Sequence, residues 1–130
     1  MVKKKIAFQG VLGAHSHVAC LKVFPHENFM SCPSFLEAFE AVERGEADLA
    51  MIPVENSAAG RVADIHAIMP NTSLYIVGEY FHQVHHHLLG VKGAKKEGVK
   101  TVFSHVQALM QCRDNLRKAE IEPQSYADTA

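Results

Sequence analysis

The chain has 130 residues, of which 48% are hydrophobic and 21% are charged, a composition typical of a soluble globular domain. Its 13 basic and 14 acidic side chains give a net charge of -1, which argues against a general nucleic-acid-binding protein because such proteins carry a basic excess. No stretch approaches the roughly 20 apolar residues of a membrane span, and the apolar run after the N-terminal lysines is broken at Gln9, which argues against a signal peptide.

Predicted strands and helices alternate along the chain. In chain order the expected strands are 5–8, 29–32, 48–54, 74–80, 100–103 and 121–126, and the expected helices are about 17–24, 35–44, 61–69 and 105–118. Ser16 and Ser104 stand where they can cap the first and last helices, while Ser34 and Glu37 form an S-x-x-E capping box at the second. This alternation favours an α/β fold with mainly parallel strands, in which ligands bind beyond the carboxyl ends of the strands.

Charge is unevenly distributed along the chain. Residues 27–55 carry an acidic excess, and residues 80–118 carry a basic excess. This asymmetry is compatible with two lobes and, more weakly, with a self-complementary contact. Scattered surface charge explains it equally well.

The three cysteines, Cys20, Cys32 and Cys112, are odd in number, widely spaced and without a C-x-x-C pair. A disulfide framework is therefore not expected, and a reducing compartment such as the cytoplasm fits better. We expect all three side chains to act as small buried hydrophobic groups.

Histidines are numerous for this length, and a cluster of them stands at His82, His85, His86 and His87. Imidazoles are zinc ligands, but no cysteine or carboxylate lies nearby at ligand spacing. A polar strand edge is therefore the preferred interpretation, and no metal is assigned. Two further histidines, His15 and His17, stand two residues apart; such a pair could also serve zinc, or both could simply be surface residues.

Three junctions between a strand and the next helix are polar in the same way, at residues 10–17, 55–60 and 104–105. Each places backbone N–H groups with hydroxyl or amide side chains at a helix N-terminus, where the macrodipole favours an anion. Singly, such residues are ordinary helix caps; together they are equally consistent with a carboxylate-binding cleft. The G-x-x-G spacing of Gly10 and Gly13 matches neither a dinucleotide loop nor a Walker loop, so no nucleotide cofactor is assigned.

The last long helix adds neutral polar groups. Gln107 and Gln111 are one turn apart and can share a face with Ser104. Such a face can orient a polar substrate or support proton transfer from a hydroxyl, although solvated glutamines on a helix surface are the more common case.

Several of these segments resemble the prephenate dehydratase family, in order and along the whole chain. The likeness is carried by the opening run 6–19, by the Glu-Asn-Ser segment within 47–62 and by the Ser-His-x-Gln-Ala segment at 104–108. Val11 and Val106 stand where the family often has proline, a change that affects local rigidity more than chemistry.

The resemblance implies two α/β lobes with a cleft between them, as in type II periplasmic binding proteins. Residues 1–77 would form the first lobe and residues 78–130 an incomplete second lobe. After Asp128-Thr129-Ala130, which resembles the start of a further motif, the family continues into a Thr-Arg-Phe motif with a catalytic threonine and a segment that returns to the first lobe. Many members add a regulatory domain that binds phenylalanine. None of these follows here, so a C-terminally truncated catalytic domain is expected.

The activity implied by the resemblance is prephenate dehydratase, a hydro-lyase that converts prephenate to phenylpyruvate with loss of water and carbon dioxide in L-phenylalanine biosynthesis. It needs no cofactor or metal, and a cytoplasmic homodimer with phenylalanine as effector of the longer protein is expected. By position, the resemblance implies catalytic roles for Asn56, Ser104 and Gln111 and substrate-binding roles for Ser16, Glu55, Ser57, His105, Gln107 and Thr129. The alternative is a non-catalytic module that binds a small carboxylate on the same two-lobe scaffold; nucleic acid and membrane partners are not expected.

Overall fold

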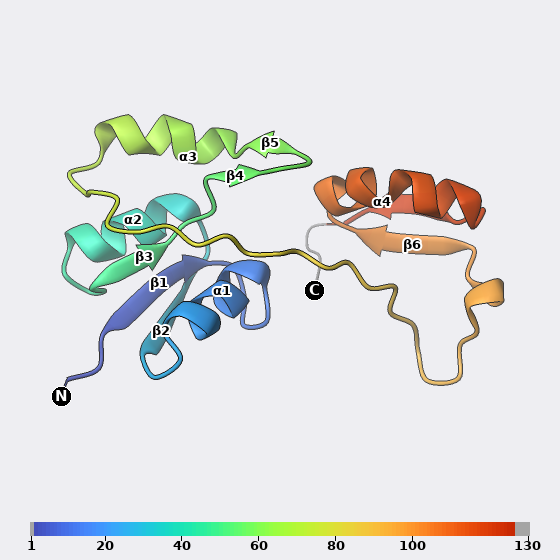
Figure 1. The fold of residues 1–130 in the computed structure, drawn as a ribbon, viewed down its shortest axis with the longest axis horizontal. Helices are drawn as coiled ribbons and strands as arrows, with labels where there is room; N and C mark the ends of the chain where they lie inside the picture. Colours follow the sequence, from blue (N-terminus) through green and yellow to red (C-terminus); the bar gives the residue numbers. More distant parts are fainter. Residues whose placement is uncertain (1, 127–130) are drawn as a thin grey trace. The chain divides into compact units, whose positions relative to one another are not determined.

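A computed structural model describes residues 2–126 of the chain. Thr129 and the motif predicted around it lie outside the described residues. The chain divides into two compact units, of which the first ends at Gln83 and the second begins at Val84 (Figure 1). The lobe boundary predicted after residue 77 falls inside the first of these units.

The first unit is built on a three-stranded parallel sheet. Its strands are β1 (Lys5–Gln9), β2 (Asn28–Cys32) and β3 (Leu49–Met51), arranged in the order β2-β1-β3 (Figure 1). The central strand pairs on both sides, so that Ile6 is opposite Phe29 on β2 and Leu49 on β3. The prediction of an α/β fold with parallel strands is therefore confirmed.

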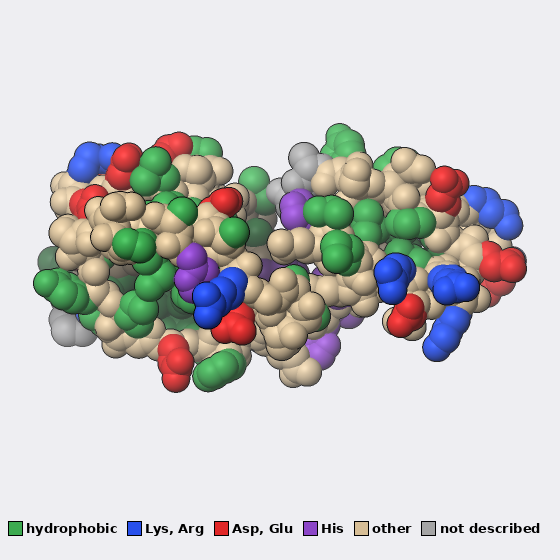
Figure 2. Space-filling model, turned by 90° about the horizontal axis from the view of Figure 1, so that it is seen from above, with side chains coloured by type: hydrophobic (Ala, Val, Ile, Leu, Met, Phe, Trp, Pro, Cys, Tyr) green, Lys and Arg blue, Asp and Glu red, His purple; other side chains and the backbone are tan. Residues whose placement is uncertain are grey.

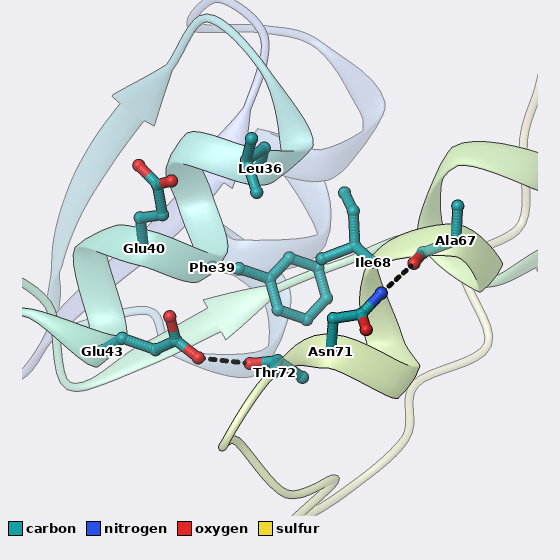
Figure 3. Close-up of a pocket in the computed structure, with 8 residues that line it drawn as sticks. All are labelled: Leu36, Phe39, Glu40, Glu43, Ala67, Ile68, Asn71 and Thr72. Carbon is teal, nitrogen blue, oxygen red and sulfur yellow. Dashed lines mark hydrogen bonds between the residues drawn. The ribbon is translucent and has the colours of Figure 1, made fainter.

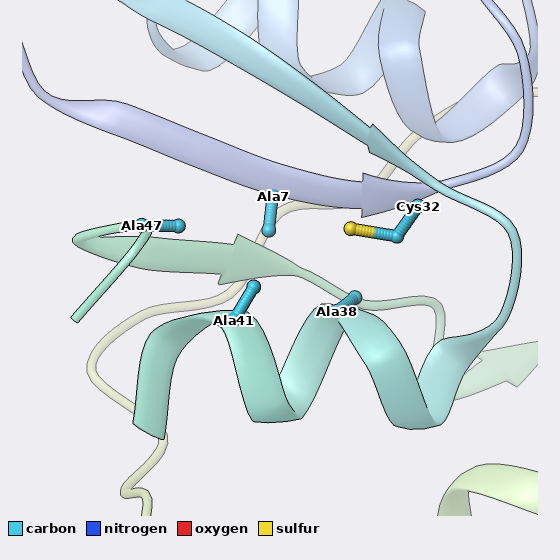
Figure 4. Packing of buried hydrophobic residues seen from close by; sticks show 5 residues of the cluster. All are labelled: Ala7, Cys32, Ala38, Ala41 and Ala47. Atoms are coloured by element: carbon cyan, nitrogen blue, oxygen red, sulfur yellow. The ribbon is translucent and has the colours of Figure 1, made fainter. Parts of the chain in front are cut away.

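Successive residues of β1 point to opposite faces of the sheet, and each face packs against one helix. Ile6 and Phe8 are fully buried with Cys20 of α1 (His15–Val23). The opposite face packs against α2 (Phe35–Glu43), and its cluster consists of small residues: Ala7, Cys32, Ala38, Ala41 and Ala47 (Figure 4). Small side chains on both surfaces let the helix backbone approach the sheet closely.

The start and end of α2 follow the signals in the sequence. The Ser34 hydroxyl oxygen accepts the backbone N–H of Glu37 at 3.2 Å, as an N-cap does. The chain turns out of the helix at Gly45, whose φ of 71° lies in the left-handed region that glycine adopts without strain. The predicted cap and stop of this helix are confirmed.

The start of α1 differs from the prediction. The helix begins at His15 with Ala14 as N-cap, so Ser16 lies inside the first turn and does not cap it. Two glycines with positive φ, Gly10 at 109° and Gly13 at 95°, let the loop turn sharply, and the Ala14 N–H bonds to the Val11 carbonyl at 3.1 Å. Because of this tight turn, α1 begins at His15, two residues before the start predicted with Ser16 as the cap.

After β3 the chain forms a short antiparallel hairpin of β4 (Glu55–Asn56) and β5 (Gly60–Arg61), followed by α3 (Ala63–Ile68) and the 3-10 turn η1 (Met69–Asn71). The strand predicted over 48–54 is thus shorter, because sheet pairing stops before Pro53.

The strand predicted over 74–80 is not formed. Its apolar side chains remain in solvent, with Tyr75 89% exposed, Ile76 72% and Val77 79%. A strand needs a neighbouring strand to pair its backbone N–H and C=O groups. No strand among residues 2–126 pairs with this segment. The local propensity of the sequence was therefore insufficient to make it a strand.

The second unit contains η2 (Lys96–Gly98), β6 (Thr101–Ser104), α4 (Val106–Lys118) and β7 (Glu122–Ser125). The two strands pair in parallel and α4 connects them (Figure 1). Ala108 and Ile121 are the buried side chains described in this unit. The predicted strand–helix–strand order is confirmed, with boundaries within a few residues.

Basic side chains of the second unit lie on its surface. All seven lysines and arginines between residues 84 and 118 are exposed. Basic side chains are visible at the right of Figure 2, with acidic side chains among them. No helix within residues 2–126 is long and apolar enough to cross a membrane.

Candidate functional site

The carboxyl ends of β1 and β3 meet at one edge of the first sheet, because the two strands are parallel neighbours. The glycine loop and the start of α1 follow β1 at this edge, and the β4–β5 hairpin follows β3. Ser16 therefore follows β1 at this edge, and Glu55, Asn56 and Ser57 follow β3. These are the predicted site residues of the first unit.

His17 holds the loop that precedes Ser16. Its Nδ1 accepts the backbone N–H of Gly13 at 3.0 Å, and its ring lies 5.2 Å from that of Phe8 and 5.5 Å from that of Phe29. The accepting Nδ1 carries no proton, so the neutral ring has its proton on Nε2. Of the alternatives for His17, a plain surface position does not hold, because its side chain is half-buried and ties the loop to the core.

Asn56 organises the hairpin that follows β3. Its Oδ1 accepts the backbone N–H of Ala58 at 2.9 Å and that of Ala59 at 3.1 Å, and its side chain is half-buried. The side-chain oxygen of Asn56 therefore holds the turn that joins β4 to β5. Glu55 and Ser57 on either side are exposed.

The predicted histidine cluster is divided between the two units. His82 lies against His15, with ring centroids 5.6 Å apart, and near Tyr80 at 6.2 Å. His86, in the second unit, bonds instead to Gln111. Among the described residues no three His, Cys, Asp or Glu side chains are grouped as a metal site would need.

In the second unit the predicted site residues stand at the carboxyl end of β6 and on the first turns of α4. Ser104, half-buried, is the last residue of β6 and is opposite Ser125 in the register of the sheet. The predicted cap by Ser104 was wrong, because His105 is the N-cap of α4: its Nδ1 accepts the Gln107 N–H at 3.3 Å. The His105 ring is therefore neutral in this geometry, with Nε2–H as a donor.

The two glutamines of α4 differ in their surroundings. Gln107 is exposed, whereas Gln111, one turn further along, is half-buried. Its Oε1 lies 2.6 Å from Nε2 of His86. Sequence reasoning treated His86 as one of several strand-edge histidines; no local signal links it to a residue 25 positions later.

Two hollows occur in the first unit, and none of the predicted site residues lines them. One, of about 330 Å³, lies between α2 and α3, and Phe39, Ile68 and Asn71 are among its walls (Figure 3). The other, of about 350 Å³, lies beside the start of α2 and reaches Gln9 and Pro33 at the strand ends.

The sequence is similar to known proteins over almost its whole length, including the predicted site residues. A sequence model of one family, described as "Prephenate dehydratase", matches residues 6–130. A relative from Komagataeibacter europaeus, named a bifunctional N-acyl-homoserine lactone acylase/prephenate dehydratase, is 42% identical over 96% of this chain and 44% of its own length. A relative from Arabidopsis thaliana, named a chloroplastic arogenate dehydratase/prephenate dehydratase, is 44% identical over 98% of this chain and 33% of its own length.

Solved structures agree on the fold. A structure described as a quorum quenching acylase, GqqA, is 40% identical and has a TM-score of 0.81 over 96% of this chain and 46% of its own. A prephenate dehydratase from Arthrobacter aurescens in complex with L-Phe is 23% identical, with a TM-score of 0.76 over 95% of this chain and 43% of its own. The chain thus spans less than half the length of these relatives, and the family resemblance drawn from its motifs is confirmed.

Proposed function

Because the chain belongs to the prephenate dehydratase family, we propose that the protein converts prephenate to phenylpyruvate. In this reaction the bond between the ring and its carboxylate breaks and releases carbon dioxide. The electron pair completes the aromatic ring as the 4-hydroxyl leaves, and one proton delivered to that hydroxyl makes it water. The observation that carries the proposal is the family match over residues 6–130, a range that includes every predicted site residue.

Aromatisation supplies much of the driving force, so the protein has two tasks. It must hold a substrate with two carboxylates, and it must deliver a proton to the leaving oxygen. Neutral donors suit both tasks, and the Ser104 hydroxyl and His105 Nε2–H are groups of this kind. We assign Asn56, Ser104 and Gln111 to catalysis and the following residues to substrate binding: Ser16, Glu55, Ser57, His105, Gln107 and Thr129.

The proposal includes the two-lobed architecture of type II periplasmic binding proteins. Support comes from the parallel α/β sheet of the first unit and the β6–α4–β7 order of the second. The similar fold of the Arthrobacter aurescens prephenate dehydratase supports it further.

The decisive experiment uses the full product of the gene, because the Thr-Arg-Phe motif of the family does not occur within residues 1–130. Incubation with prephenate is expected to yield phenylpyruvate, and Ser104→Ala is expected to lower kcat about tenfold or more without lowering Tm. Ser125→Ala, opposite Ser104 in the sheet, is the matched control and should retain wild-type kcat. A folded full product that forms no phenylpyruvate would refute the dehydratase, and a wild-type rate in Ser104→Ala would refute the role of Ser104.

The 130-residue chain by itself is expected to bind prephenate weakly and to turn it over little. Robust turnover by this chain would show that the threonine of the missing motif is dispensable. Binding without turnover by the full product would favour the alternative, a non-catalytic carboxylate-binding module.

Arogenate is the second substrate to compare, because several plant relatives are named arogenate dehydratases. It differs from prephenate by an amine in place of the side-chain keto group, so the same elimination yields phenylalanine. The ratio of kcat/KM for the two substrates measures which one the site selects.

A second candidate activity is hydrolysis of N-acyl-homoserine lactones, because the Komagataeibacter europaeus relative is named for both activities. The test is release of homoserine lactone and a fatty acid from an acylated substrate. Ser104→Ala should lower this activity as well if both reactions use one site.

Assembly, regulation and location complete the proposal. We propose a homodimer, in the cytoplasm, whose full form responds to phenylalanine; the relative solved with L-Phe supports testing this ligand. Several plant relatives are named chloroplastic, so location is a property to measure for each member.

A further inference from the structure

The start of α1 is held by the side chain of His17, the third residue of this helix. Nδ1 of His17 accepts the backbone N–H of Gly13 at 3.0 Å, so the bond reaches back over the helix start to the glycine loop. A backbone N–H can only donate, so the direction of this bond is fixed and the accepting nitrogen carries no proton. The bond closes the five residues from Gly13 to His17 into a ring, and Ser16 lies within it.

This helix needs such a bond because its N-cap is an alanine. Ala14 has no side-chain oxygen to accept an N–H of the first turn, whereas Ser34 accepts one in α2. In a capping box the third helical residue reaches back to the N–H of the N-cap. Here that N–H is bonded to the Val11 carbonyl at 3.1 Å, and His17 reaches one residue further back, to Gly13. His17 therefore provides the side-chain bond that fixes the start of α1.

The imidazole ring of His17 is itself fixed by the sheet. It lies 5.2 Å from the ring of Phe8 on β1 and 5.5 Å from the ring of Phe29 on β2, and the latter contact is edge-to-face at 83°. The other end of the glycine loop is held by β2, because the Gly10 N–H donates to the Cys32 carbonyl at 3.0 Å. The loop is thus tied to the core at both ends, and the tie next to α1 depends on one side chain.

We propose that His17 is a positioning residue, which holds Ser16 in the orientation in which it binds the substrate. The inference rests on the proposed function, which assigns Ser16 to substrate binding. Gly13 has a φ of 95° and, as a glycine, can adopt many other backbone conformations once its N–H is released. The entry to α1 would then vary, and the substrate would have to order it on binding, which weakens affinity.

Two substitutions in the full gene product separate the acceptor of His17 from its ring. His17→Phe keeps a ring against Phe8 and Phe29 but removes the acceptor, whereas His17→Asn keeps an acceptor oxygen close to the position of Nδ1 and removes the ring. The Phe variant should raise KM for prephenate about tenfold, the effect of one lost hydrogen bond, with kcat unchanged. The Asn variant should keep the wild-type KM. A wild-type KM in the Phe variant, or an equal rise in both variants, would overturn the inference.

Thermal unfolding of the same variants separates positioning from a general structural role. His17→Asn loses the contacts with both phenylalanine rings, so it should have the lower Tm of the two variants and yet the lower KM. The exposed His26→Ala is the control and should match the wild type in both measurements. A KM that rises in step with the fall in Tm across the variants would mean that His17 only stabilises the fold.

A double-mutant cycle tests whether His17 acts through Ser16. In the Ser16→Ala background His17→Phe should raise KM no further, because the group that it positions is gone. An equal rise in both backgrounds would show that His17 acts through another group.

One readout does not depend on activity. In NMR spectra the amide proton of Gly13 should exchange with solvent faster in His17→Phe than in the wild type or in His17→Asn. Equal exchange in all three proteins would overturn the inference. A folded full product that converts neither prephenate nor arogenate would instead overturn the proposed function, so the two failures are distinct.

Discussion

Thr72 donates its hydroxyl to the Glu43 carboxylate at 2.7 Å, across 29 residues of sequence (Figure 3). The same oxygen accepts the backbone N–H of Ser73 at 3.0 Å and its hydroxyl at 3.2 Å. Glu43, the last residue of α2, therefore fixes the position of the segment that follows η1. These bonds to the Ser73 N–H and the Thr72 hydroxyl lower the pKa of Glu43 below its usual 4.5.

The first prediction concerns the acid dependence of this link. Because the pKa of Glu43 is lower in the folded protein than in the unfolded chain, its stabilisation is fully present above pH 4.5 and is lost as the pH falls through the folded-state value. Glu43→Gln mimics the protonated group and should lower Tm near neutral pH. The difference in Tm between the two proteins should shrink toward zero in acid.

Glu79→Gln is the matched control, because Glu79 is exposed and no hydrogen bond within residues 2–126 involves its carboxylate. Its Tm should follow the wild type at every pH. A constant Tm difference for Glu43→Gln from neutral to acid pH would contradict the proposed cause.

The second prediction separates the two ends of the Asn56 carboxamide. Asn56→Asp keeps an oxygen for the N–H groups of Ala58 and Ala59 and should retain these two bonds, whereas Asn56→Ala loses both and should cost about 1–2 kcal/mol. Yet Asn56→Asp replaces the donor by a negative charge, so prephenate binding should weaken about tenfold or more. Urea unfolding and a binding titration measure the two effects, and unchanged binding in Asn56→Asp would remove Asn56 from the site.

The sequence was most informative where local chemistry decides structure. Ser34 and Gly45 mark the ends of α2, and both act as predicted because a cap needs only neighbouring backbone. The motif at Glu55 to Ser57 predicted a polar junction, but not that Asn56 would use its oxygen to hold the hairpin. Local spacing indicated the residue type, and the structure was needed to show which atom of the side chain holds the turn.

The sequence was least informative where a distant partner decides. The apolar run around Ile76 has the composition of a strand, yet it is exposed because no described strand pairs with it. Ser104 looked like a cap, but the adjacent His105 reaches the Gln107 N–H instead. The bond between His86 and Gln111 likewise depends on how the loop before η2 returns to α4, which periodicity does not encode.

The third prediction tests the two roles of His17. His17→Phe preserves a ring against Phe8 and Phe29 but removes the acceptor for the Gly13 N–H, and it should cost about 1 kcal/mol in the free energy of unfolding. His17→Ala also removes the ring contacts and should cost about 1–2 kcal/mol more. Urea unfolding gives both values, and the exposed His26→Ala should behave as the wild type. Equal stability of the Phe and Ala variants would mean that the ring contacts contribute nothing.

The fourth prediction concerns thiol reactivity, since only a thiolate reacts quickly with a disulfide reagent. Burial raises the pKa of Cys20 to about 11, and burial together with the charge of Glu37 raises the pKa of Cys32. Cys112 is half-buried on α4, so the prediction of a buried side chain holds for Cys20 and Cys32 but not for Cys112. In the native protein Cys112 should therefore react first, and Cys112→Ser should abolish the fast phase.

Peptide mapping by mass spectrometry identifies the labelled thiol, and the same reaction in urea should expose the other two. Cys20 packs against Ile6 and Phe8 on one face of the sheet, while Cys32 packs against Ala38 on the other. Their protection thus reports on each face separately. Rapid native labelling of Cys20 alone would mean that α1 leaves the sheet while α2 stays packed, and rapid labelling of both would mean that neither helix covers β1 as described.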